Sequence, residues 1–82
     1  MSFGYSQSLV FANKQADSKL IGVALGRMCI QLNISVRDVA DTFGVSRVTV
    51  YSWFTGASTP RADVAKYIES YIRLNKNKRK LK

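Results

Sequence analysis

The sequence contains no histidine, and this absence bears on both catalysis and metal binding. Histidine is the commonest general base near neutral pH and the commonest metal ligand. The five acidic residues are scattered, and no Cys, Asp or Glu cluster has the spacing of a metal site. A glycine-rich phosphate loop is also missing. We therefore expect that the protein is not an enzyme and that it binds no metal, cofactor or small-molecule ligand.

Cysteine and long apolar runs are scarce as well. The single cysteine, Cys29, cannot form an internal disulfide, and its place in a helical pattern favours a buried thiol. The longest apolar runs fall far short of the about 20 residues that a membrane span needs. The first residues lack the basic-then-apolar layout of a signal peptide. We expect a cytoplasmic protein with no membrane partner.

Basic residues, in contrast, are abundant and unevenly placed. The 82-residue chain has 13 Lys and Arg, five Asp and Glu, and a net charge of +8. Residues 1–45 have a net charge of +1 and residues 46–82 a net charge of +7. A strongly basic half favours a polyanionic partner such as a nucleic acid.

The hydrophobic content of 46% predicts one small folded domain. From about Asp17 to Asn33, apolar residues recur every three or four positions, which predicts a helix with one buried face. Asp17 or Ser18 is suited to cap its start. Gly22 and Gly26 form a small face on this helix, where another element can approach closely.

Two further helices are predicted around a glycine. The first runs from the cap Ser35 to about Phe43, and Gly44 stops it. Ser46 caps the next helix, which runs to about Phe54 and ends near Gly56. Two helices joined by such a short turn meet at a steep angle, and the first then supports the second as it projects from the surface.

A fourth helix follows, with Thr59 as its cap and Pro60 in its first turn. We expect it to fray into a basic tail, residues 76–82. Residues 1–16 form an N-terminal arm that is too apolar to be freely solvated, so it docks on the domain, forms a short strand or contacts a partner chain. The prediction is an all-α domain of four helices, residues 17–75, between this arm and the tail.

The segment "SVRDVADTFGVSRVTVYSWFTG", residues 35–56, resembles the helix-turn-helix of the lambda repressor and Cro (XRE-type) family of DNA-binding proteins. The resemblance extends over residues 20–74, through "LNIS" and "PRADVAKYIESYI". It implies a lambda repressor-like fold of the kind that phages and mobile elements use. The sequence shows no counterpart of the family's fifth helix.

The resemblance implies that residues 46–54 form the recognition helix, which enters the major groove with its N-terminal residues leading. It places five residues where they can contact bases: Arg47, Val48, Thr49, Tyr51 and Ser52. Phosphate contacts are expected from polar and basic residues around them and in the tail: Ser46, Thr55, Arg37, Arg61, Lys76, Lys78, Arg79 and Lys80. Trp53 is expected in the core, and Phe54 is expected to pack against the fourth helix.

These expectations add up to a sequence-specific regulator of transcription, a repressor, that binds double-stranded DNA at the nucleoid, or in the host cytoplasm if it is phage-encoded. Because one recognition helix reads only a few base pairs, a homodimer is expected. Its contact is formed by apolar residues of the arm (Phe3, Tyr5, Leu9, Val10 and Phe11) or by the face of the fourth helix with Tyr67 and Tyr71.

Other functions remain open at this point. The same fold serves an architectural protein that bends DNA or assists recombination. A basic surface also suits a protein-interaction adaptor, and the basic tail permits RNA binding. A basic amphipathic membrane helix fits least, because the apolar faces are needed for the core.

Overall fold

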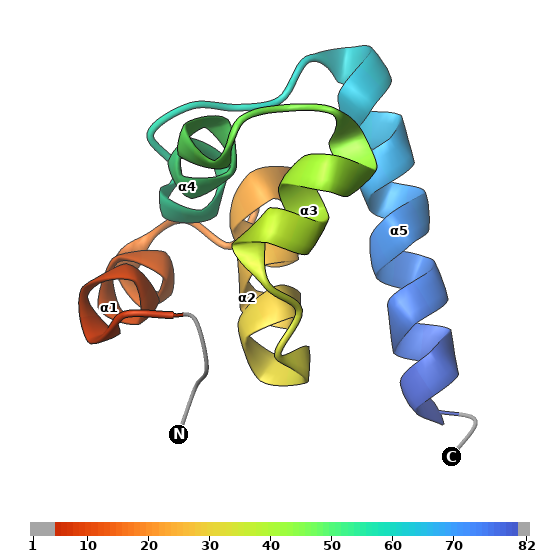
Figure 1. Cartoon of the computed structure of the whole chain (residues 1–82), viewed down its shortest axis with the longest axis horizontal. Helices are drawn as coiled ribbons and strands as arrows, with labels where there is room; N and C mark the ends of the chain where they lie inside the picture. The colour runs from red at the N-terminus through yellow and green to blue at the C-terminus, as the bar shows by residue number, and fades with distance from the viewer. Residues whose placement is uncertain (1–4, 81–82) are drawn as a thin grey trace.

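The computed structural model describes residues 5–80, with the side chains of residues 5–76. This part of the chain is all-helical, as expected, but it holds five helices instead of four: α1 (Gln7–Gln15), α2 (Ile21–Leu32), α3 (Val36–Phe43), α4 (Arg47–Thr55) and α5 (Ala62–Lys80). Figure 1 shows α2 in the middle of the molecule, with the other helices around it.

The additional helix, α1, lies within the segment expected to be an arm. The Ser6 hydroxyl caps it by accepting a hydrogen bond from the Leu9 amide at 3.1 Å. The helix packs against α2 and α4. Of the three alternatives for this segment, docking on the domain is therefore correct, and the prediction of four helices was wrong. Residues 1–4, including Phe3, lie outside the described residues.

The start of α2 also differs from the prediction. The Asp17 carboxylate accepts the Lys19 amide at 2.9 Å and holds a turn, so the helix begins only at Ile21. Asn33 ends the helix in the left-handed conformation with φ of 59°, as expected.

The small face of α2 lies at its crossing with α4. A Cβ atom added to Gly22 would lie 2.8 Å from both the Cβ and the carbonyl oxygen of Trp53. One added to Gly26 would lie 2.8 Å from the Phe54 ring. The predicted close approach is confirmed, because the absence of two side chains lets α4 lie directly on α2.

The helix α5 starts later and extends further than predicted. It begins at Ala62, so Thr59 is not its cap and Pro60 is not in its first turn. It then continues through Lys80, so residues 76–80 are helical and not a separate tail. Residues 81–82 lie outside the described residues. None of the helices described is long and apolar enough to cross a membrane.

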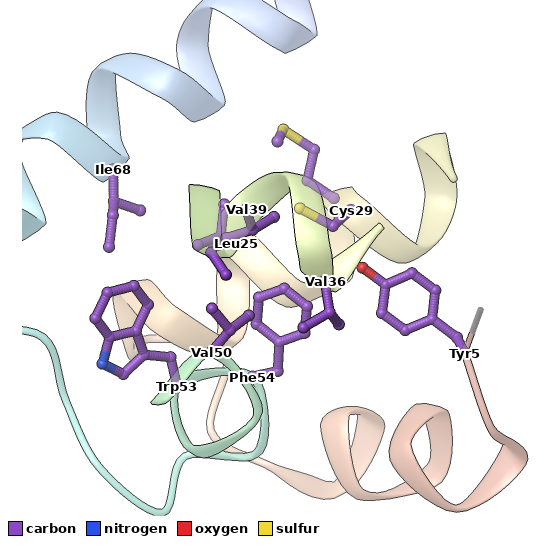
Figure 2. Packing of buried hydrophobic residues seen from close by; sticks show 11 residues of the cluster. Tyr5, Leu25, Cys29, Val36, Val39, Val50, Trp53, Phe54 and Ile68 are labelled. Atoms are coloured by element: carbon purple, nitrogen blue, oxygen red, sulfur yellow. The ribbon is translucent and has the colours of Figure 1, made fainter. Parts of the chain in front are cut away.

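The core lies where α2, α3, α4 and α5 meet (Figure 2). Trp53 and Phe54 of α4 are buried there, together with Ile68 of α5 and Val39 of α3. The Phe54 ring stacks on Tyr5 with centroids 6.2 Å apart and lies against α2, and it belongs to the same buried cluster as Ile68 of α5. One side of α4 is thus fixed inside the domain.

Candidate nucleic-acid interface

The turn between α3 and α4 is closed by backbone and hydroxyl groups. The Ser35 hydroxyl accepts the Asp38 amide at 3.1 Å at the start of α3. Gly44 then ends α3 with φ of 66°, and the Val45 amide donates to the Ala40 carbonyl at 3.0 Å. The Ser46 hydroxyl accepts the Thr49 amide at 3.2 Å at the start of α4. The predicted helix-turn-helix is present.

Gly44 is required here for its backbone conformation alone. A Cβ atom added to it would have no neighbour within 4 Å, so space is not the constraint. A positive φ is strained for residues with a side chain, by about 1–2 kcal/mol. Glycine therefore lets the chain leave α3 and enter α4 within three residues.

The face of α4 that is turned away from the core carries three of the five predicted base-reading residues. Arg47 and Tyr51 are exposed, and Val48 is 73% exposed. The opposite face, with Val50, is fully buried. The helix α4 thus exposes three side chains to solvent, those of Arg47, Val48 and Tyr51, while its opposite face is packed in the core.

The hydroxyl groups of Thr49 and Thr55 have partners within α4 or at its cap. Thr49 Oγ1 lies 3.0 Å from the Ser46 hydroxyl. Thr55 Oγ1 donates to the Tyr51 carbonyl at 3.0 Å. Ser52 is half-buried, and its carbonyl accepts the Ser58 amide at 3.2 Å. The Thr49 and Thr55 hydroxyl groups are therefore less free to contact a ligand than the Arg47 and Val48 side chains.

The predicted phosphate-contacting cations are spread over α3, the start of α5 and the end of α5. Arg37 is exposed in the first turn of α3, and Arg61, exposed and just before α5, pairs with Asp63 at 3.5 Å. Lys76 is exposed towards the end of α5, which lies at the opposite end of the molecule from the α3–α4 turn (Figure 1). The side chains of Lys78, Arg79 and Lys80 are outside those described.

The buried titratable groups are structural. Burial raises the pKa of the Cys29 thiol to about 12, so it stays protonated at neutral pH. Burial also raises the pKa of Tyr5, whose hydroxyl donates to the Ile34 carbonyl, and the pKa of Tyr71. No three His, Cys, Asp or Glu side chains in the described part of the chain lie close enough together to hold a metal ion.

Two polar residues that hold α1 to the domain were not singled out from the sequence. The Asn13 side chain donates to the Phe54 carbonyl at 2.7 Å, and Arg27 donates to the Lys14 carbonyl at 3.1 Å. Their partners lie far away in the sequence, so no local pattern identifies them.

A comparison with protein families agrees with the geometry of the turn. A family model described as "Helix-turn-helix" matches residues 25–76, which is more than half of the chain. A search of the curated proteins found no match, and neither did a search of the solved structures. The matched segment contains α3, the turn and α4, and it leaves out α1. The chain therefore belongs to the XRE-type helix-turn-helix family of DNA-binding transcription regulators.

Proposed function

We propose that the protein is a sequence-specific repressor that reads the major groove of double-stranded DNA with the first turn of α4. The observation that supports this most is the placement of Arg47 and Val48, which are exposed on that turn while the opposite face of α4 is buried. A recognition helix needs this combination, because base contacts require free side chains on a rigid support.

Each group has a chemical role in this proposal. The Arg47 guanidinium donates two hydrogen bonds to O6 and N7 of a guanine, and Val48 contacts a thymine methyl. Tyr51, Thr49 and Ser52 contact bases further along the groove. Arg37 and Arg61 bind phosphates, together with the hydroxyl groups of Ser46 and Thr55. The phosphate contacts position the protein without selecting a sequence.

Selection from a random pool of duplex DNA at near-physiological salt tests this function. We expect an enriched motif made of two inverted half-sites about one helical turn apart. An occupied operator that overlaps a promoter then excludes the polymerase, and this takes place at the nucleoid. Binding without any enriched sequence would contradict the proposal and favour an architectural role driven by charge.

We further propose that two copies associate through the groove between α3 and α5. Its walls are Thr42, Phe43, Val64, Tyr67, Ser70, Tyr71 and Leu74. Tyr67 is 71% exposed and Leu74 is 62% exposed, so an apolar ridge borders the groove. In the N-terminal segment, by contrast, Tyr5 is buried in its own core, and only Phe11 is exposed among its described apolar residues.

Exposed charges of both signs lie on the two helices that form this groove. Exposed Asp38 lies one turn before Thr42 on α3, and exposed Lys66 precedes Tyr67 on α5. The same chain therefore supplies both the apolar ridge and the complementary charges.

Replacing Tyr67 with Glu is expected to weaken this dimer by about 2 kcal/mol or more, close to 30-fold, because a carboxylate would be desolvated in the contact. Sedimentation equilibrium measures the dissociation constant. The matched control is Phe11→Glu, an equally exposed aromatic residue on α1, which should leave the dimer intact. If Phe11→Glu gives the monomer and Tyr67→Glu does not, the contact lies on α1.

A further inference from the structure

The recognition helix is held at its C-terminal end by a residue from α1. Asn13 is 1% exposed and is the one polar or charged residue that is fully buried among those described. Its side-chain amide donates to the Phe54 carbonyl at 2.7 Å and to the Val23 carbonyl at 3.2 Å. One side chain thus links α1 to α2 and α4 at once.

The Phe54 carbonyl is one of those at the end of α4 that have no partner within the helix. Its neighbours are satisfied locally, since the Trp53 carbonyl accepts the Gly56 amide and the Ser52 carbonyl accepts the Ser58 amide, both at 3.2 Å. The Phe54 carbonyl instead receives its donor from another helix, 41 positions away in the sequence. This hydrogen bond therefore ties the C-terminal end of α4 to α1.

Two residues of α2, Gly26 and Arg27, lie against Asn13. A Cβ atom on Gly26 would lie 2.7 Å from the Asn13 amide nitrogen, so the missing side chain makes room for it. The next residue, Arg27, donates from Nη2 to the carbonyls of Asn13, Lys14 and Ala16 at 3.1–3.4 Å. A cation at these carbonyls also suits the negative end of the α1 dipole. The side-chain amide of Asn13 thus lies against Gly26, and its backbone carbonyl is bound by Arg27.

We propose that Asn13 is a positioning residue for DNA recognition, which sets the angle at which α4 enters the groove; this inference rests on the proposed function. Arg47 lies seven residues from Phe54, about 10 Å along the helix. A tilt of about 10° at Phe54 then moves Arg47 by about 2 Å, several times the about 0.5 Å range of good hydrogen-bond lengths. Since α1 lies outside the matched family segment, this contact is an addition to it.

The test compares Asn13→Ala with wild type on two duplexes, the selected operator and a scrambled duplex of equal length. We expect the affinity for the operator to fall about tenfold, which is the effect of losing one base contact. The affinity for the scrambled duplex should change by less than about twofold. A purely structural role would instead lower both affinities together, in proportion to the folded fraction. The control Ile68→Val removes a buried methyl group away from α1 and should keep the ratio of the two affinities.

Arg27→Lys provides a second variant if Asn13→Ala does not fold, because it keeps the charge and removes the Nη2 group that donates to the three carbonyls. We expect Arg27→Lys to lower the ratio of operator affinity to scrambled-duplex affinity by less than Asn13→Ala does. An unchanged ratio in the folded variant, or an equal fall in Ile68→Val, overturns the role of Asn13 and leaves the proposed function intact. If wild type itself enriches no sequence, both the proposed function and this inference are wrong.

Discussion

Phe54→Ala is expected to destabilise the domain by about 3–5 kcal/mol, because the substitution leaves a cavity where three helices meet. The ring is fully buried, stacks on Tyr5 and lies against Gly26 of α2. A native domain has only about 5–15 kcal/mol of stability, so much of it is lost. Urea unfolding followed by circular dichroism measures the change.

Phe11→Ala is the matched control for this substitution. Phe11 is 65% exposed on α1, so the same truncation removes few contacts. We expect it to change the free energy of unfolding by no more than about 0.5 kcal/mol. A loss below about 1 kcal/mol for Phe54→Ala would show that the α2–α4 crossing does not depend on this ring.

The features that the sequence predicted well are those with local causes. Ser35, Gly44 and Ser46 act on backbone groups within five residues of themselves, so their roles follow from residue type and spacing. The close approach at Gly22 and Gly26 also followed from a four-residue spacing, although the sequence did not identify α4 as the partner.

The features that the sequence missed depend on distant partners. The helix α1 is fixed by the amide of Asn13 and the guanidinium of Arg27, whose acceptors are backbone carbonyls that no sequence pattern marks. The late start of α5 was also missed: Thr59 and Pro60 are typical of a helix start, yet the helix begins only at Ala62.

The candidate site was predicted in part. The family resemblance placed five residues of α4 where they can contact bases, and three of them, Arg47, Val48 and Tyr51, are exposed. It did not predict that the hydroxyl groups of Thr49 and Thr55 have partners inside the helix. Arg47 and Val48 are therefore the stronger candidates for base reading.

Arg47→Ala is expected to weaken operator binding by about 1–3 kcal/mol, a loss of about 5-fold to 150-fold, if its guanidinium binds a guanine in the groove. The stability of the fold should not change, because the side chain is exposed. Repeating the selection with the variant should show relaxed preference at one base pair of each half-site. Titration of labelled operator and scrambled duplexes measures the two affinities.

Arg61→Ala is the matched comparison, since it removes the same group from a position expected to contact phosphate. Its exposed pair with Asp63 contributes little to stability. Arg61→Ala should weaken operator and scrambled DNA equally and lower the log–log salt slope by about 0.9. Arg47→Ala should instead weaken the operator alone. If Arg47→Ala follows the Arg61→Ala pattern, Arg47 binds the phosphate backbone, and base reading must come from Val48 and Tyr51.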